Sequence, residues 1–481
     1  MNLKFVFLEV SLLKKIFFVG ALIISVLFLN VQISVCANYH PDLSEEEYIE
    51  MLNETISQIK NNFVDTEKIS LEKLYFGAIE GALKSLDDPY SRFLPPEKYD
   101  DLKMKTTSKF GGLGIVISKR DKDLTVVSPI LGTPAFKLGI KPGDIIIEIE
   151  NESTENLSLQ EAVERMRGEP GTKVSITVSR SEFKQPKKFT IIRDVIKIET
   201  VQSKMLNDEI GYIRLLEFSE PSHKEILKAL AELKALGMKK LIFDLRNNPG
   251  GLLDSAYDIS NLFLDRGLVV YTRGRHSHQN KNYYAKPDYY DIKEIPLIVL
   301  ANGGSASGSE IVIGAIKDNK RGLIVGEKTF GKGLVQSVFP FRKLTNTNSG
   351  VAITTAKYYT PSGVCIQDTG IFPDIEIKPK KSTEEEAENL IKFIDKDYSL
   401  KYVKKYPVYK EEELNNFLKE LKKEGITISK EMVESLIKEQ YAREEGKHYF
   451  ADLSVDEVLK RAVDLFTTYD IFMKSTKVDG K

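Results

Sequence analysis

The chain has 481 residues, a length that corresponds to about three or four domains of ordinary size. Hydrophobic residues make up 42% of it, which excludes a wholly disordered protein, and 69 Lys and Arg against 70 Asp and Glu give a formal net charge of −1. This balance argues against a nucleic-acid partner, which would call for a basic excess. Two cysteines are too few for a disulfide-rich scaffold, and five histidines are too few to suggest a structural metal site. We also expect no cofactor.

The N-terminal residues 1–37 are predicted to be a signal peptide or a membrane anchor. Residues 16–35 contain no charged side chain and follow the basic pair Lys14 and Lys15, and about 20 apolar residues are enough to span a bilayer. The small-residue ending at residues 35–37 also fits a cleavable signal. Because the basic pair should stay in the cytoplasm, we expect the rest of the chain to be extracytoplasmic, in contact with the cytoplasmic membrane if the segment is retained.

Helices are predicted at both ends of the exported part. Residues 42–105 carry apolar side chains at helical spacing, and a Pro-rich connection, DPYSRFLPPEKY, occupies residues 88–99. Residues 380–481 are highly charged and are predicted to form amphipathic helices. Their Glu and Lys runs are expected to form solvent-exposed faces or a dimer element.

Residues 106–195 consist of short β-like runs that follow a glycine loop. Strands are predicted at residues 115–118, 124–127, 145–149, 174–178 and 189–192, with a helix over residues 159–167. Backbone N–H groups of such a loop can hold a terminal carboxylate, while the adjoining strand edge pairs with the peptide main chain. The stretch GTPAFKLGIKPGDIIIEIENES, residues 132–153, resembles the centre of a PDZ domain. A substrate C-terminus is therefore expected to bind around Gly112, Leu113, Gly114 and Ile115.

Residues 201–379 alternate strands and helices as a layered α/β domain does. The predicted strands are residues 210–215, 241–245, 297–300, 323–325, 335–339 and 352–359. The predicted helices are residues 222–236, residues 252–264 and a third helix that ends at about residue 317. Two loops directly follow buried apolar strands, RNNPGG at residues 246–251 and NGGSASGSE at residues 302–310. Because catalytic groups gather beyond the carboxyl ends of strands in such domains, these loops are the first place to look for chemistry.

Two familiar kinds of site fit this domain poorly. Residues 326–333, GEKTFGKG, match a phosphate-binding loop, but Gly333 stands where a Ser or Thr would hold magnesium, and a strand is predicted to follow instead of a helix. A Ser-His-Asp hydrolase of the GxSxG kind is equally disfavoured, because no such motif surrounds Ser305, Ser307 or Ser309.

A serine nucleophile with a lysine base is the third candidate. A lysine can accept the proton of a serine hydroxyl when burial lowers its pKa toward neutral. Ser307 follows a buried strand and begins a helix, where backbone N–H groups can stabilise an oxyanion. One helix and one strand can then return Lys332, which lies between two glycines, to the same edge of the sheet. The spacing alone favours the simpler interpretation, in which Ser305 is a helix cap and Lys332 is a lysine in a surface turn.

Several longer motifs resemble those of the C-terminal processing peptidases, the tail-specific serine proteases of family S41, in the family's order. They are DPYSRFL (88–94), IGYIRLLEF (210–218), DLRNNPGG (244–251), GGSASGSEIVIGAIKDNKRGLIVGEKTFGKGLVQ (303–336), and TPSG with GIFPDIEI (360–377). The resemblance covers residues 42–380 and implies a multidomain α/β (α+β) fold. Its expected parts are a helical region (42–105), a PDZ domain (106–195), a crotonase-like α/β protease core (201–379 together with 42–105) and a helical C-terminal region (380–481).

The resemblance also implies roles for individual residues. It places a Ser-Lys dyad on Ser307 and Lys332, with Gln336 as the orienting partner of the lysine. The oxyanion hole would be made by backbone N–H groups, with Gly250 or Gly251 as one donor and Gly308 as the other. Arg167, at the end of the PDZ helix, is either a reporter between PDZ domain and active site or an ordinary cation at a helix C-terminus.

The expected function is therefore that of a serine endopeptidase. Its PDZ domain would capture the free, apolar C-terminus of a protein or peptide, and the dyad would hydrolyse a peptide bond through an acyl-enzyme. A catalytically inactive PDZ scaffold in the cell envelope is the alternative, although a scaffold does not require Ser307, Lys332 and Gln336. The resemblance and the helical flanks also suggest a homodimer.

Overall fold

The computed structural model describes residues 43–120, 122–180, 182–287, 292–341, 348–378 and 383–478. The segment predicted to be a signal peptide or anchor lies outside these ranges. Among the described helices, none combines the length and the apolar character needed to cross a membrane. The chain divides into two compact units, Met1–Ser85 and Leu86–Lys481.

The described part of the first unit consists of helices, as predicted. Helix α2 spans Glu45–Asn62, η1 spans Thr66–Lys68 and α3 spans Leu71–Lys84. Helix α2 begins with a capping box in which Ser44 and Glu47 satisfy each other's backbone N–H groups. This local sequence signal accounts for the position of the helix start.

A six-stranded sheet forms the centre of the second unit. The strands follow the order β10 (Val201–Met205), β11 (Ile210–Leu215), β12 (Lys240–Asp244), β15 (Leu297–Ala301), β16 (Leu323–Gly326) and β19 (Ile375–Glu376). Only the β10–β11 pair is antiparallel. Strands β12 and β15 are buried throughout, as expected for parallel strands covered on both faces, and the predicted α/β fold class is confirmed.

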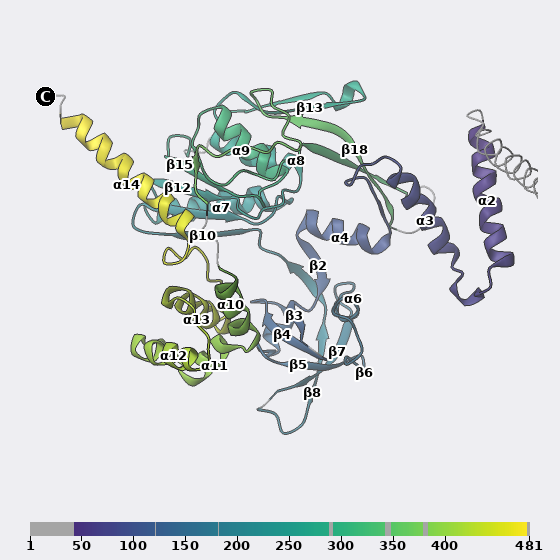
Figure 1. The fold of residues 1–481 in the computed structure, drawn as a ribbon, viewed down its shortest axis with the longest axis horizontal. Coiled ribbons are helices and arrows are strands. Elements are labelled where there is room, and N and C mark those ends of the chain that lie inside the picture. The colour runs from purple at the N-terminus through teal and green to yellow at the C-terminus, as the bar shows by residue number, and fades with distance from the viewer. Residues whose placement is uncertain are drawn as a thin grey trace, which may run out of the picture. The chain divides into compact units, whose positions relative to one another are not determined.

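Helices cover both faces of this sheet (Figure 1). One face packs against α7 (Ser222–Ala235), α8 (Leu253–Phe263) and α9 (Gly308–Asp318) in a large apolar cluster. The other face packs against the first turns of α14 (Glu457–Val478), whose buried side chains include Leu459 and Phe466. The C-terminal region, predicted as a separate helical part, therefore supplies a layer of the core.

A second sheet brings the Pro-rich connection beside the later strands of the core. Its order is β1 (Arg92–Leu94), β18 (Gly350–Tyr359), β13 (Leu268–Gly274) and β14 (Lys281–Tyr284), with β17 (Leu334–Pro340) also paired to β18. Phe93 of β1 lies opposite Val351 of β18. Helix α4 (Pro96–Thr107) follows β1 and leads to the predicted PDZ domain.

The predicted PDZ domain has its own sheet and its own core. The strand order is β3 (Ile115–Arg120), β4 (Asp123–Pro129), β5 (Ile145–Ile149), β7 (Lys173–Ser179) and β8 (Lys187–Ile192), with β6 (Glu152–Ser153) on β5 and a separate pair of β2 (Lys109–Gly112) with β9 (Asp194–Lys197). Helices α5 (Pro134–Lys137) and α6 (Leu159–Met166) complete it. Ile146, Ile149 and Ile176 are fully buried at its centre. Strand β3 lies at the end of the sheet order, so one of its edges carries no partner strand among the described residues.

Four short helices precede α14. They are α10 (Glu384–Asp395), α11 (Tyr398–Lys405), α12 (Glu411–Lys423) and α13 (Lys430–Glu444). An aromatic cluster of their own holds them together, with Phe393, Tyr402 and Phe417 at its centre. These helices form a small subdomain between the last sheet strand and α14.

Candidate active site

Ser307 lies at the point where the loop after β15 turns into α9. Its backbone has φ +53°, an unusual value for a residue other than glycine, and its side chain is partly exposed. The Ser307 N–H donates to the Glu310 carboxylate at 2.9 Å. The next N–H group, that of Gly308, donates to no other residue in the described ranges.

Hydrogen bonding separates Ser307 from the two neighbouring serines. Ser305 is fully buried and donates its hydroxyl to the Leu245 carbonyl oxygen at 2.8 Å. Ser309 is also fully buried and donates to the Asn248 carbonyl oxygen at 2.9 Å. Both hydroxyls therefore hold loops together, and Ser307 is the member of the trio that a substrate can reach.

The loop at residues 246–251 lies directly against Ser307. A Cβ atom added to Gly250 would lie 2.7 Å from both the Gly308 nitrogen and the Ser307 Cβ, and Gly250 has φ +98°, so only glycine permits this approach. The Gly250 N–H donates to Asn248 Oδ1 at 2.9 Å. The N–H of Gly251 has no partner among the described residues. Gly251 and Gly308 are thus the free donors of the three predicted oxyanion residues.

The buried carboxylate of Glu310 joins the serine segment to the lysine segment. Besides the Ser307 N–H, it accepts the N–H groups of Gly331 at 2.8 Å and Lys332 at 2.9 Å, and the Thr329 hydroxyl at 2.6 Å. Burial raises the pKa of Glu310, and these four donors work in the opposite direction. One side chain therefore fixes the backbone of both predicted dyad residues.

The amine of Lys332 occupies a partly buried position. Its Nζ lies 4.8 Å from the centre of the Tyr90 ring. Burial lowers the pKa of Lys332, the nearby Arg92 lowers it further, and Asp88 and Glu310 oppose the shift. A lowered pKa is the property that a lysine needs to act as a general base near neutral pH.

Tyr358, a fully buried residue of β18, contacts both members of the predicted dyad. Its hydroxyl donates to the Lys332 carbonyl oxygen. Burial raises the pKa of this phenol, and a hydrogen bond with the Ser307 side chain works in the other direction. Within the described residues, no direct hydrogen bond joins Ser307 Oγ to Lys332 Nζ. Tyr358, like Glu310, therefore links the serine segment to the lysine segment.

Gln336 follows on β17 but turns to the neighbouring strand. Its Nε2 donates to Thr354 Oγ1 of β18 at 3.3 Å, and no hydrogen bond to Lys332 is found among the described residues. Its role as orienting partner of the lysine stays a prediction.

Sequence reasoning missed Glu310 and Tyr358 as parts of this site. For Glu310 a signal exists, because a serine followed three residues later by glutamate at a helix start is the capping-box pattern. For Tyr358 we find no local signal, because its contact with Lys332 depends on the pairing of β17 with β18.

The predicted peptide site lies on the edge strand of the PDZ domain. Leu113 and Gly114 connect β2 to β3, and their N–H groups donate to no other described residue. Gly114 has φ +76°, and a Cβ there would lie 2.3 Å from the Thr133 side chain. Helix α6 contacts β3. A loop with free N–H groups, an open strand edge and a flanking helix is the arrangement that β-augmentation uses.

Arg167 directly follows α6 and reaches out of the PDZ domain. Its Nη1 donates to Asp101 of α4 at 3.1 Å, and its guanidinium lies 5.3 Å from the centre of the Phe110 ring. Its Nε is buried and has no partner among the described residues. Arg167 thus connects α6 to α4, the element that follows β1.

Three family models match successive parts of the chain: the N-terminal domain of the activating protease CtpB (residues 31–97), the PDZ domain (residues 101–179) and peptidase family S41 (residues 209–377). A carboxy-terminal-processing protease from Bartonella bacilliformis is 38% identical over 370 residues, 76% of this chain and 82% of that protein. The chain belongs to peptidase family S41. It is a serine-type peptidase of the carboxy-terminal processing kind with a PDZ domain, which confirms the activity predicted from the motifs.

Further relatives of this S41 peptidase span most of its length. A carboxyl-terminal-processing protease from Synechocystis sp. is 41% identical and covers 62% of this chain and 70% of its own. A carboxy-terminal processing protease, CtpA, from Bacillus subtilis is 37% identical over 68% of this chain and 68% of its own. Among solved structures, the photosystem II D1 C-terminal processing protease is 30% identical, with a TM-score of 0.40 over 70% of this chain and 94% of that one.

Proposed function

We propose that the peptidase cleaves its substrates with Ser307 as nucleophile and Lys332 as general base. The observation that supports this most strongly is the Glu310 carboxylate, which binds the backbone of both residues in one buried cluster. Around that cluster lie a partly exposed serine and a lysine whose pKa burial lowers. These are the two properties that nucleophile and base require.

The reaction then proceeds in two halves. Ser307 Oγ attacks the peptide carbonyl carbon while its proton passes to Lys332 Nζ, and the N–H groups of Gly251 and Gly308 stabilise the oxyanion. The Lys332 ammonium gives the proton to the leaving amine, which leaves an ester on Ser307. Water, deprotonated by the same lysine, hydrolyses the ester and regenerates the hydroxyl.

We further propose that the PDZ domain selects substrates by a free, apolar C-terminus. The peptide would add a strand to β3, and its carboxylate would bind the N–H groups of Leu113 and Gly114, with Gly112 and Ile115 completing the loop. Ile115 and Ile117 of β3 are only partly buried against the apolar core of the domain, which supports an apolar last side chain.

An assay with one unstructured protein in two forms tests this proposal. The form with a free apolar C-terminus should be hydrolysed at least about tenfold more efficiently than the form with an amidated C-terminus, because the amide removes the charge that the loop N–H groups bind. Hydrolysis should disappear in Ser307→Ala. Equal rates for the two forms would contradict C-terminal capture, and no hydrolysis of either would favour the inactive scaffold.

Arg167 gives a separate prediction about communication between the PDZ domain and the active site. Arg167→Ala should change the activation of hydrolysis by added C-terminal peptides several-fold, since it removes the contact with Asp101. Arg165→Ala is the matched control, because Arg165 lies in the last turn of the same helix but pairs with Glu152 inside the PDZ domain. Activation that responds equally to both substitutions would make Arg167 an ordinary helix-end cation.

We also propose an extracytoplasmic location for the peptidase. The support is the sequence alone, with its basic pair and the uncharged residues 16–35. Assembly into a homodimer through the helical flanks is a second proposal that is supported by the sequence alone. Fractionation of cells that produce the full chain, and light scattering on the purified protein, test the two proposals.

A further inference from the structure

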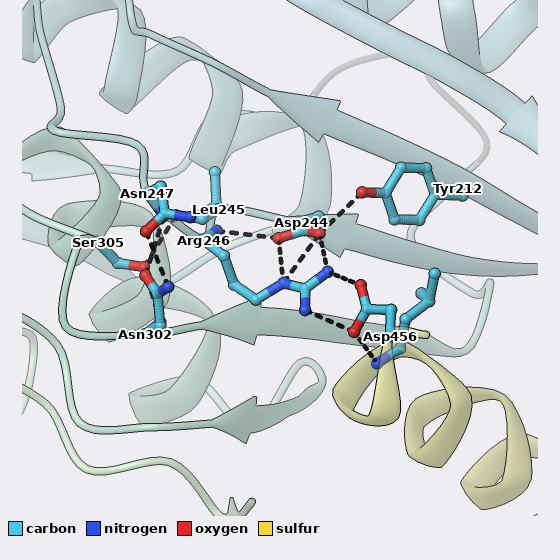
Figure 2. Close-up of polar contacts among 9 residues, drawn as sticks. Tyr212, Asp244, Leu245, Arg246, Asn247, Asn302, Ser305 and Asp456 are labelled. Atoms are coloured by element: carbon cyan, nitrogen blue, oxygen red, sulfur yellow. Dashed lines mark hydrogen bonds and ion pairs between the residues drawn. The ribbon is translucent and has the colours of Figure 1, made fainter. Parts of the chain in front are cut away.

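The loop that carries the predicted oxyanion donors begins with an arginine that binds the C-terminal helix. Figure 2 shows Arg246 between two carboxylates, Asp244 at the end of β12 and Asp456 just before α14. Its Nη1 and Nη2 donate to the two Asp456 oxygens at 2.8 and 2.6 Å. Its Nε and Nη2 donate to Asp244 at 2.6 to 3.0 Å. The guanidinium therefore pairs with two carboxylates, one from the sheet and one from the start of the C-terminal helix.

This ion-pair cluster is largely shielded from solvent. The Asp244 side chain is 1% exposed, that of Arg246 17% and that of Asp456 21%. Asp244 also accepts the Tyr212 hydroxyl at 2.8 Å and the Arg246 N–H at 2.9 Å. Bidentate bonds between arginine and carboxylate fix both distance and orientation, so the position of Arg246 is defined with little freedom.

The residues after Arg246 lead directly to the active site. Asn247 exchanges two hydrogen bonds with Asn302, from the loop before Ser307, at 2.9 and 3.0 Å. Asn248 binds the Ala306 N–H at 3.0 Å, and Gly250 lies against Ser307. A displacement of Arg246 would therefore be transmitted to Asn247 and Asn248, and from them to Gly250 and Gly251.

Asp456 has a second function, at the start of α14. Its Oδ1 accepts the Leu459 N–H at 2.9 Å, which makes it the N-cap of the helix. Leu459 itself is fully buried against the sheet. Asp456 therefore joins a rigid part of the core to the base of the 246–251 loop.

We propose that Asp456 is a positioning residue for catalysis, because it holds the oxyanion loop in place through Arg246. The inference rests on the proposed roles of Ser307, Gly251 and Gly308. Asp456 is not among the residues proposed to bind the substrate or the oxyanion, so its effect should fall on the rate of the chemical step and not on substrate binding. The C-terminal helix thereby becomes part of the active-site scaffold.

The substitution Asp456→Ser separates the two functions of this residue. A serine is as good an N-cap as an aspartate, so α14 keeps its start, but the short side chain cannot reach Arg246. We expect kcat to fall about tenfold with KM within about twofold of the wild type. Asp456→Glu, which can still pair with Arg246, should recover a large part of the rate.

Glu457→Gln is the matched control for charge. Glu457 is exposed, lies next to Asp456 at the same helix end and carries the same charge. The substitution Glu457→Gln should leave kcat and KM unchanged. A tenfold loss in Glu457→Gln as well would mean that charge at the helix end, and not the contact with Arg246, sets the rate.

Amide hydrogen exchange provides a readout that does not depend on activity. In Asp456→Ser the N–H groups of residues 246–251 should exchange faster than in the wild type, while those of α14 keep their protection. Unchanged exchange in the loop together with unchanged kcat would overturn the proposal. If instead Ser307→Ala retained activity, the dyad assignment would be wrong, and the exchange measurement would still decide whether Asp456 holds the loop.

Discussion

Replacing Ser307 by alanine is expected to lower kcat on the order of 10⁴-fold or more, the loss that removal of a serine nucleophile causes in serine proteases. The substitution removes one partly exposed hydroxyl and leaves the Glu310 bonds to the backbone intact. The free energy of unfolding should therefore change little. Hydrolysis of an unstructured protein, together with thermal unfolding of both proteins, measures the two effects separately.

The two neighbouring serines provide the controls. Ser305→Ala and Ser309→Ala each remove a buried hydroxyl that bonds a backbone carbonyl, so each should destabilise the protein by about 1–3 kcal/mol. Labelling by a serine-reactive fluorophosphonate should persist in both variants and disappear in Ser307→Ala. A probe that still labelled Ser305 or Ser309 in the absence of Ser307 would contradict the assignment of the nucleophile.

Much of the fold can be predicted from the sequence because most elements carry their own local signal. The predicted strand over residues 210–215 and the strand over residues 145–149 agree with β11 and β5 to the residue. Both have apolar runs bounded by turn residues. Strands β13 and β14 were not predicted, because Leu268–Gly274 runs into a polar, tyrosine-rich loop and is stabilised by pairing with β18.

The parts of the site that escape sequence reasoning are those made by contacts over long sequence distances. Arg246 and Asp456 are 210 positions apart, and neither has a neighbour in the sequence that points to the other. The same holds for Tyr358, which reaches Lys332 only after β17 and β18 have paired. Motifs identify residues within one loop, whereas the packing that orients them is a property of the folded chain.

The pH dependence of hydrolysis should reveal Lys332 as the base. The amine must be neutral to accept the Ser307 proton, so kcat/KM should fall about tenfold for each unit of pH below the pKa of Lys332. Burial and the nearby Arg92 lower that pKa from the ordinary value for lysine, 10.5. The shift extends the active range toward neutral pH, since the fraction of neutral amine at a given pH rises as its pKa falls.

Two charge substitutions should shift the acidic limb of this pH profile, the range in which kcat/KM falls as the pH is lowered, in opposite directions. Arg92→Gln removes a positive charge that lowers the pKa of Lys332, so the limb should move to higher pH. Asp88→Asn removes a negative charge that raises it, so the limb should move to lower pH. Lys332→Arg should lose activity at every pH, because a guanidinium stays protonated. A limb that remained in place in both charge variants would require a base other than Lys332.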